Sequence, residues 1–256
     1  MADARCIKAI EAAASRAWPT AETESLGGWV LRCGRAGSRR LNSVQTLAFE
    51  DGADLDAAIA AAEGWYRSRG LPPCFQLNDA VQPRALDAEL HRRGYEIITP
   101  TSVMIARDPP APVVDQGIAL SSHADDRVVQ AIFDSSWKTP VRLERLEVFA
   151  RIAAPHRFAL VVVGGVPVAG GMCVADGGLA GLFSMRTQPA HRGRGLARAV
   201  AQRLMSWARE QQAGQVYLQV EDHNAAALSL YRGLGFERVY GYHYREKAAD
   251  ASTGPT

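Results

Sequence analysis

The segment from His191 to Ala197 has residue types and a spacing that could bind a phosphate group. It reads His-Arg-Gly-Arg-Gly-Leu-Ala, so glycines separate Arg192 from Arg194 and follow it. Small residues let the backbone approach a ligand, the first N–H groups of a helix lack internal partners, and guanidinium groups offer forked donors to oxyanions. The pattern G-x-x-x-x-G-K-[ST] is absent, and G-x-G-x-x-G fails at Arg198. Taken alone, the segment is equally consistent with a solvated basic turn.

A second motif lies downstream and changes this balance. The pattern [QR]-x-x-G-x-[GA] is matched by Arg192, Gly195 and Ala197. The pattern N-x-x-A-x-x-[LF]-Y-x-x-x-G-F is matched by a longer set of residues, namely Asn224, Ala227, Leu230, Tyr231, Gly235 and Phe236. In order and spacing, residues 117–246 resemble the GNAT superfamily of acetyl-CoA-dependent N-acetyltransferases.

The resemblance implies a cofactor site. Acetyl-CoA, the acyl donor, is expected where two parallel strands separate, with its pantetheine amides on the strand backbone and its pyrophosphate on the Gly-rich loop. No metal is expected. The residues implied in cofactor binding are Met185, Arg186, Thr187, Arg192, Gly193, Arg194, Gly195, Leu196, Ala197, Asn224 and Tyr231.

The resemblance also implies catalytic residues. The general acid of the family falls on Tyr231, whose hydroxyl could protonate the leaving thiolate. The usual basic glutamate falls on Gly181 or Gln219, and neither can accept a proton at neutral pH. Glu221 and the neighbouring Asp222 are the carboxylate candidates for the base, and a water chain is an alternative. A neutral amine substrate would need a base less.

Hydrophobic periodicity predicts the elements that position these residues. Val-rich runs around Gly164-Gly165, and a third run after Gly177-Gly178, predict three consecutive antiparallel strands. Apolar positions at helical spacing follow Gly195, and Asn224 is a suitable N-cap for a second helix. The expected strands are 157–163, 166–174, 179–185, 216–220 and 236–244, and the expected helices run from 196 to near 214 and from 225 to near 233–235.

A Pro-rich segment, Asp108-Pro109-Pro110-Ala111-Pro112, divides the chain. We expect a degenerate, non-catalytic GNAT-like domain at 1–108, a linker at 109–116, a catalytic domain at 117–246 and a flexible tail at 247–256. The fold class is α/β (α+β), with two tandem GNAT-type domains. Each is a mixed, mostly antiparallel sheet flanked by helices, and the C-terminal copy has a central, splayed pair of parallel strands.

An internal repeat supports the tandem arrangement. A constant shift of 141 residues aligns seven structural positions, including Leu55 with Leu196 and Gly94 with Gly235. It also places 42–44 opposite 183–185, the loop 51–54 opposite the Gly-rich loop, and Leu90 opposite Tyr231. Two carboxylates, Asp51 and Asp54, would repel a phosphate there, so the first copy is expected to be inactive. Chance similarity between two helix-strand arrangements is the alternative.

Composition limits the other classes of function. The net charge of +2 provides no overall field toward nucleic acid, and the aromatic residues fall in apolar patterns, so no nucleic-acid partner is expected. No stretch could span a membrane, no signal peptide is apparent, and the four cysteines are scattered, so we expect a cytoplasmic protein that is a monomer or weak homodimer. The expected partner is a small-molecule or peptide amine. The competing function is a non-catalytic acyl-CoA sensor or pseudoenzyme.

Overall fold

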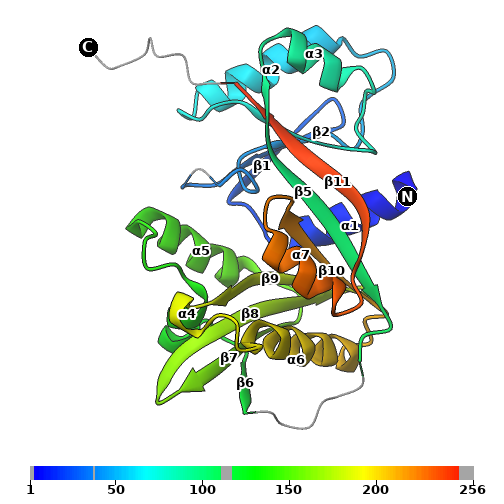
Figure 1. The fold of residues 1–256 in the computed structure, drawn as a ribbon. Coiled ribbons are helices and arrows are strands. Elements are labelled where there is room, and N and C mark those ends of the chain that lie inside the picture. Colours follow the sequence, from blue (N-terminus) through cyan, green and yellow to red (C-terminus); the bar gives the residue numbers. More distant parts are fainter. Residues whose placement is uncertain (1–2, 37, 111–116, 248–256) are drawn as a thin grey trace. The chain divides into compact units, whose positions relative to one another are not determined.

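The computed structural model describes residues 3–36, 38–110 and 117–247. These residues form two compact units. The first, called here the C-terminal unit, consists of residues 9–19 and 102–239; the second, the N-terminal unit, consists of residues 20–101 and 240–247 together with the first few residues of the chain. Strands β5 (Glu96–Arg107) and β11 (Glu237–Glu246) and helix α1 (Ala4–Ala17) each pass from one unit to the other. Figure 1 labels the elements.

The C-terminal unit is built on a mixed sheet with strand order β5-β10-β9-β8-β7-β6. Strands β6 to β9 pair antiparallel in succession, and β10 pairs parallel with β9. The three consecutive strands and their turns were predicted from the sequence and are confirmed. Their bounds, with β6 and β10, are Ile118–Ser121 (β6), His156–Val163 (β7), Val166–Asp176 (β8), Leu179–Thr187 (β9) and Gln215–Glu221 (β10).

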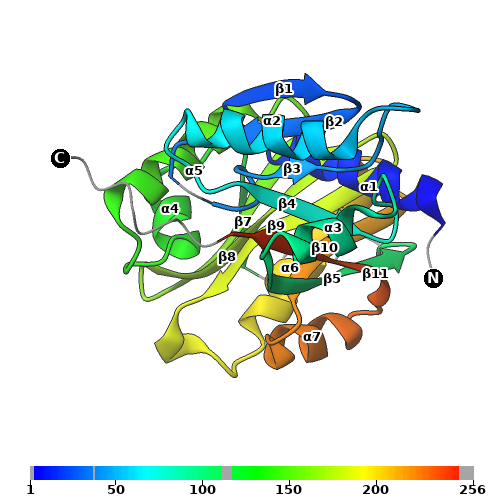
Figure 2. The same cartoon turned by 90° about the horizontal axis from the view of Figure 1, so that it is seen from above.

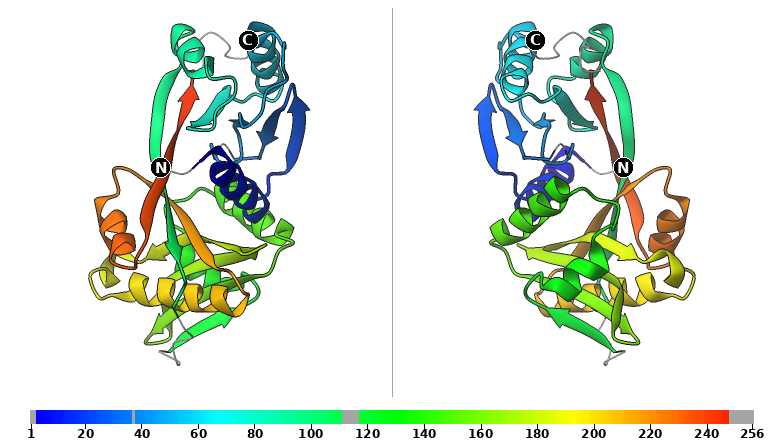
Figure 3. Two further views of the ribbon diagram at one scale, coloured as in Figure 1. Left: turned by 90° about the vertical axis from the view of Figure 1, so that its right-hand side faces the viewer. Right: turned by 90° about the vertical axis from the view of Figure 1, so that its left-hand side faces the viewer.

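Helices cover both faces of this sheet. The neighbouring glycines 170 and 171 of β8 face opposite sides: a Cβ on Gly170 would meet Ile132 of α4 (Asp126–Ile132), and one on Gly171 would meet Leu204 of α6 (Leu196–Glu210). Figure 3 agrees, since α6 lies in front of the sheet in one view and behind it in the opposite view. The phosphate-loop helix and the helix preceding α5 (Thr139–Arg151) therefore lie on different faces.

Helix α6 forms as its sequence pattern predicts. Val200, Leu204 and Trp207 are buried in the core against strand residues such as Leu182 and Leu218, which recur every second position of β9 and β10. After β10, helix α7 (Ala225–Arg232) packs its Tyr231 into the same core. The 3-10 turn Pro189–His191 links β9 to the Gly-rich loop.

The N-terminal unit has strand order β1-β2-β3-β4-β11, with helices α2 and α3 packed on it. Its core gathers Trp29, Val44, Tyr66, Phe75 and Leu90, from three strands and both helices. Figure 2 shows α2 crossing β2 and β3. The bounds are Glu22–Leu26 (β1), Trp29–Cys33 (β2), Val44–Gln45 (β3), Leu55–Arg67 (α2), Cys74–Asn78 (β4) and Leu86–Arg92 (α3).

The two units share element positions at the shift expected from the repeat. Helices α2 and α6 begin at Leu55 and Leu196, β4 and β10 at Cys74 and Gln215, and β5 and β11 at Glu96 and Glu237, each pair 141 residues apart. The turn after the short helix is shared too. The N–H of Tyr95 donates to Leu90 O at 3.0 Å, and the N–H of Phe236 donates to Tyr231 O at 3.0 Å, past glycines with φ of 82° and 84°. Leu90 therefore occupies the helical position of Tyr231.

The repeat is offset in one strand. Phe75 pairs with Val44 in the N-terminal unit, whereas Val216, its counterpart at the shift of 141, pairs with Ala180. Val44 therefore corresponds to Ala180, and the expected match of residues 42–44 with 183–185 is wrong by five residues. The connection from β3 to α2 is shorter by the same length than that from β9 to α6, and a shift without gaps could not detect this.

The compact units differ in extent from the domains expected at 1–108 and 117–246. Most of α1 groups with the later residues, and the end of β11 groups with the earlier ones. The division into catalytic and non-catalytic roles remains a prediction. Most of the predicted linker (111–116) and almost all of the predicted tail (248–256) lie outside the described residues.

Candidate active site

The parallel strands β9 and β10 separate within the C-terminal unit. They pair from Leu179 with Gln215 as far as Leu182 with Leu218, and β9 then continues to Thr187 and β10 to Glu221 without further pairing to each other. The backbone groups of residues 183–187 that face β10 are therefore left for another partner. This is the splayed pair that the sequence led us to expect.

A β-bulge in β9 lies just beyond the point of separation. The register against β8 shifts between Gly170 and Met172, and Ser184 has φ of 52°, which a non-glycine residue rarely adopts. The Met185 side chain packs over Gly171, where a Cβ would collide with its sulfur. Ser184 Oγ and Thr187 Oγ1 are buried and have no hydrogen-bond partner among the described residues. Unused polar groups therefore accompany the unpaired strand.

The Gly-rich loop leads from this strand into α6. Its N-cap is Gly195, with φ of 75° and no side chain to accept hydrogen bonds from the first turn. Arg192 and Arg194 are exposed, and Arg192 Nε donates to Thr187 O at 3.4 Å. The N-terminal N–H groups of a fifteen-residue helix thus lack a side-chain cap beside two guanidinium groups, an arrangement suited to an anion.

Helix α7 carries the other predicted residues. Asn224 is its N-cap, and Asn224 Oδ1 accepts from the N–H of Ala227 at 3.1 Å. Arg198 Nη1 of α6 donates to Gly233 O at 2.8 Å, which holds the end of α7 beside the first turn of α6. Tyr231 is buried against Phe236, with ring centroids 5.7 Å apart, and burial raises the pKa of its phenol to about 12. The phenol therefore stays protonated at neutral pH.

The carboxylates proposed as the base lie at the end of β10 and are exposed. The Glu221 side chain is 51% exposed, and its Oε2 lies 3.4 Å from His223 Nδ1. Asp222 Oδ1 accepts from Ser102 Oγ at 2.6 Å, and Ser102 Oγ accepts in turn from Arg238 Nε at 3.1 Å. Asp222 is therefore held in a structural network, whereas Glu221 faces water.

The position of Gly181 is closed by aromatic rings. Gly181 lies opposite Tyr217 in the parallel register, and a Cβ on it would lie 2.6 Å from Tyr217 Oη and 2.5 Å from Phe183 Cε2. A glutamate could not stand there without displacing Tyr217. Sequence reasoning noticed the missing carboxylate but missed Tyr217, because an aromatic residue in a buried strand carries no signal beyond core packing.

A second set of polar residues reaches β9 from the segment between α4 and α5. Asp134 forms an ion pair with Arg186 Nη1 and accepts from Ser136 N at 2.9 Å and Ser136 Oγ at 2.6 Å. The Ser136 hydrogen bonds and then Arg186 hold the pKa of Asp134 well below its usual value. The Arg186 side chain is therefore engaged by the protein, and only its backbone is available for the expected cofactor role.

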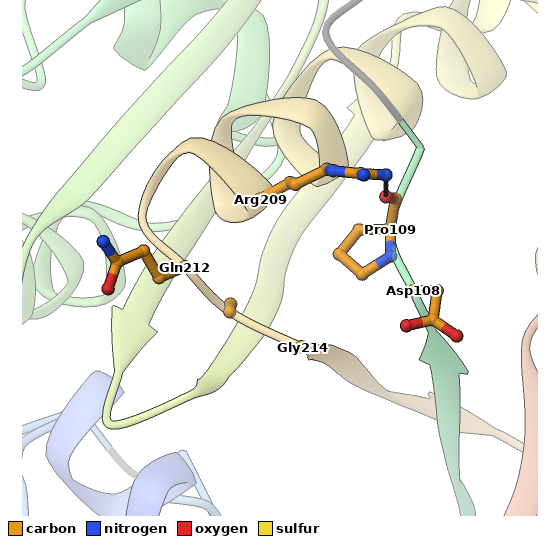
Figure 4. A pocket seen from close by; sticks show the side chains of 6 residues that line it. Asp108, Pro109, Arg209, Gln212 and Gly214 are labelled. Carbon is orange, nitrogen blue, oxygen red and sulfur yellow. Dashed lines mark hydrogen bonds between the residues drawn. The ribbon is translucent and has the colours of Figure 1, made fainter.

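The larger surface hollows of the C-terminal unit lie elsewhere. One, of about 390 Å³, is lined by Asp108, Pro109 and the residues that follow α6, with Arg209 Nη1 donating to Pro109 O at 2.9 Å (Figure 4). Another, of about 290 Å³, lies beside the turn at Gly177. Both are at the end of α6 opposite the Gly-rich loop, so neither belongs to the candidate site.

A mixed sheet with two separating parallel strands, a bulge at the point of separation and an uncapped helix after a basic Gly-rich loop define an acetyltransferase of the GNAT type. The family model described as probable histone acetyltransferase Rv0428c, C-terminal, matches residues 4–245. The chain belongs to this family.

Individual relatives agree. The uncharacterized N-acetyltransferase YobR of Bacillus subtilis is 29% identical over 94% of this chain and 98% of its own length. The probable histone acetyltransferase Rv0428c of Mycobacterium tuberculosis is 29% identical over 93% of this chain and 73% of its own. A GCN5-related N-acetyltransferase structure from Kribbella flavida covers 96% of both chains with a TM-score of 0.71 at 18% identity. The GNAT class expected from the two motifs is confirmed.

The predicted residues thus fall on three connected elements of one unit. Met185, Arg186 and Thr187 lie on the unpaired end of β9, residues 192–197 form the loop and the start of α6, and Asn224 and Tyr231 lie on α7. Their individual roles remain predictions. In the described ranges, no group of three or more His, Cys, Asp or Glu could hold a metal. No helix among them is long and apolar enough to cross a membrane.

Proposed function

We propose that this acetyltransferase transfers the acetyl group of acetyl-CoA directly to a primary amine of a small molecule or peptide. The observation that carries the proposal is the uncapped N-terminus of α6, with Arg192 and Arg194 beside it, directly after the unpaired end of β9. A diphosphate fits this donor set, since backbone N–H groups and forked guanidinium donors converge on one place. The orphaned Thr187 Oγ1 provides a further polar group along the same path.

Acetyl-CoA supplies an acetyl group activated as a thioester. The backbone of Met185, Arg186 and Thr187 would hold its amide-bearing arm in the place of a strand partner. Gly193, Gly195, Leu196 and Ala197 would present N–H groups to the pyrophosphate, with the two arginines balancing its charge. The glycines leave room for this approach because nothing lies within 4 Å of a Cβ on either.

Tyr231 is the proposed general acid. Its phenol has a pKa of about 12, so it carries a proton throughout the neutral range and can donate it to the departing sulfur. Asn224 fixes the start of α7 and hence the placement of Tyr231. Glu221 remains the carboxylate proposed to take up a proton, and its exposure favours a route through water over direct contact.

The acceptor amine is not identified by these features. The name of the Mycobacterium tuberculosis relative suggests protein lysines, and the peptide and small-molecule amines of the wider superfamily are the alternatives. A sensor that binds acyl-CoA without turnover is the second candidate, and the absence of a carboxylate at Gly181 and Gln219 is the observation that favours it.

Turnover decides between enzyme and sensor. Release of free coenzyme A is measured with acetyl-CoA and an amine panel of amino acids, polyamines, aminoglycosides and peptides with free N-termini. Acetyltransfer to at least one amine, at a rate well above hydrolysis without amine, is expected. Tight acetyl-CoA binding with no transfer to any amine would contradict the proposal and favour the sensor.

A further inference from the structure

The wall of the acceptor side of β9 is aromatic where its relatives' chemistry would use a carboxylate. Tyr217 and Phe183 fill the space over Gly181, and their rings meet edge to face with centroids 6.0 Å apart. Phe183 stacks in turn on Trp18, with centroids 5.7 Å apart and planes 25° apart. All three side chains are less than a tenth exposed. The residues that flank the splayed strands on this face are thus apolar and fixed.

The carboxylates nearest to this wall along the chain are already engaged or face water. Asp134 is neutralised by Arg186 and hydrogen-bonded by Ser136. Asp222 is bonded to Ser102, and Glu221 is half exposed beside His223. An ion-paired carboxylate is a weak proton acceptor, because taking up a proton would break the pair.

The helices packed on this face contribute further charged groups. Helix α5 carries the buried Glu144, and Arg145 lies 4.1 Å from the ring centroid of Trp137 and 5.4 Å from that of Trp18. The end of α1 carries the buried Glu11, and Arg16 pairs there with Asp176 at 2.6 Å. Glu11 and Glu144 both interact with other residues of the protein. The charges on this side are therefore used in packing and pairing.

A charged ammonium would lose its hydration at this wall, and no free carboxylate replaces it there. Building on the proposed function, we infer that the acceptor reaches the site as a free base, and that the enzyme is selective for amines of low basicity. An α-amino group of an amino acid or peptide fits this requirement, whereas the ε-amine of lysine and the amines of polyamines do not.

The size of the effect follows from ordinary amine pKa values. An α-amine with a pKa near 7.8 is about one-third free base at pH 7.5, whereas a lysine amine with a pKa near 10.4 is only ~0.1% free base. The greater nucleophilicity of the more basic amine offsets part of this difference, so we expect a preference of tenfold or more.

The step balances without a protein base. The amine nitrogen forms the new C–N bond, the C–S bond breaks, and the nitrogen releases its surplus proton to water. Tyr231 donates a proton to the sulfur and recovers one from solvent. The products are the N-acetylated amine and free coenzyme A.

The test uses the full chain, acetyl-CoA and the peptide Ala-Gly-Lys-Gly, which offers one α-amine and one ε-amine. Mass-spectrometric fragmentation locates the acetyl group after partial reaction at pH 7.0. Two matched peptides, one blocked at its N-terminus and one with lysine replaced by alanine, give the two rates separately. Acetylation at the α-amine at least ten times faster than at the ε-amine is expected.

A pH series gives an independent readout. If the acceptor enters as the free base, the rise of kcat/KM with pH levels off at the pKa of each amine, and the break moves when glycinamide replaces a more basic amine. A break at one pH for all amines overturns the inference, because a protein group would then be the proton acceptor. Equal or faster acetylation at the ε-amine, or transfer to a polyamine but to neither peptide amine, also overturns it. Absence of transfer to any amine removes the proposed function itself.

Discussion

Asp54 caps helix α2 with its own carboxylate, whereas Gly195, 141 residues later, leaves helix α6 without a side-chain cap. Asp54 Oδ1 accepts from the N–H of Asp56 at 2.9 Å and from that of Ala57 at 3.3 Å. The same helical position is thus self-satisfied in one unit and open in the other. The expected inactivity of the first copy gains a physical basis, since an anion at α2 would compete with a carboxylate of the protein itself.

Replacement of Asp54 by alanine should lower the free energy of unfolding by about 1 kcal/mol, because two N–H groups of α2 lose their acceptor. Urea denaturation measures the change, with Asp51→Ala as the matched exposed control. Acetyl-CoA should still bind with a stoichiometry of one. An equal effect of the two substitutions, or a second equivalent of bound acetyl-CoA in the unchanged protein, would contradict this account of the N-terminal unit.

Replacement of Tyr231 by phenylalanine should remove the proton donor and leave the helix packed, since the ring fills the core and makes the contact with Phe236. We expect kcat to fall about 100-fold with little change in acetyl-CoA affinity. With the pKa of the phenol raised to about 12, the acid should not be lost by ionisation between pH 7 and pH 10. An unchanged kcat in the variant would exclude Tyr231 from the mechanism.

Replacement of Gly181 by alanine should be destabilising, because its Cβ would lie 2.6 Å from Tyr217 Oη in a closely packed region. We expect a loss of about 2 kcal/mol, typical of an overpacked core. Gly214→Ala is the matched control in the same unit, since nothing lies within 4 Å of a Cβ there. Thermal denaturation compares the two. Equal melting temperatures would mean that Tyr217 does not occupy the space over Gly181.

The Asp134 carboxylate should make stability depend on acidic pH. Its pKa is held below the usual value in the native state, so the unfolded chain binds this proton at a higher pH than the native chain does. The stabilisation is present above about pH 4 and is lost as the pH falls toward the native pKa. Asp134→Asn should therefore be less stable than the unchanged protein at pH 7 and should approach it at pH 3. Asp79→Asn, which changes an exposed carboxylate, should show no such convergence.

The sequence was sufficient to predict the elements that follow a local pattern. The strand and helix alternation from Arg157 to Tyr244 was predicted correctly, because turns at Gly164-Gly165 and caps at Gly195 and Asn224 mark the ends of periodic runs. The phosphate loop and α7 were found because their motifs are contiguous. These features depend on residues close together in the chain.

Features that depend on distant residues could not be predicted in this way. The stacking of Trp18 on Phe183 joins residues 165 positions apart, and the pair Asp134–Arg186 joins residues 52 apart. The bulge at Ser184 follows from the register against β8, and the offset of β3 follows from its pairing with β4. Register and side-chain partners arise only once the sheet has assembled, so the acceptor side was the least accessible to sequence reasoning.

The central claim is that the loop from Arg192 to Ala197 binds the pyrophosphate of acetyl-CoA. Isothermal titration of acetyl-CoA into the full chain tests it directly, by comparing the unchanged protein with Arg192→Glu/Arg194→Glu and with the exposed control Arg5→Glu/Arg67→Glu, which carries the same change of charge. Loss of two charge-assisted contacts predicts binding weaker by about 100-fold or more in the loop variant, with the control unchanged. Undiminished affinity in the loop variant, or an equal loss in the control, would contradict the claim.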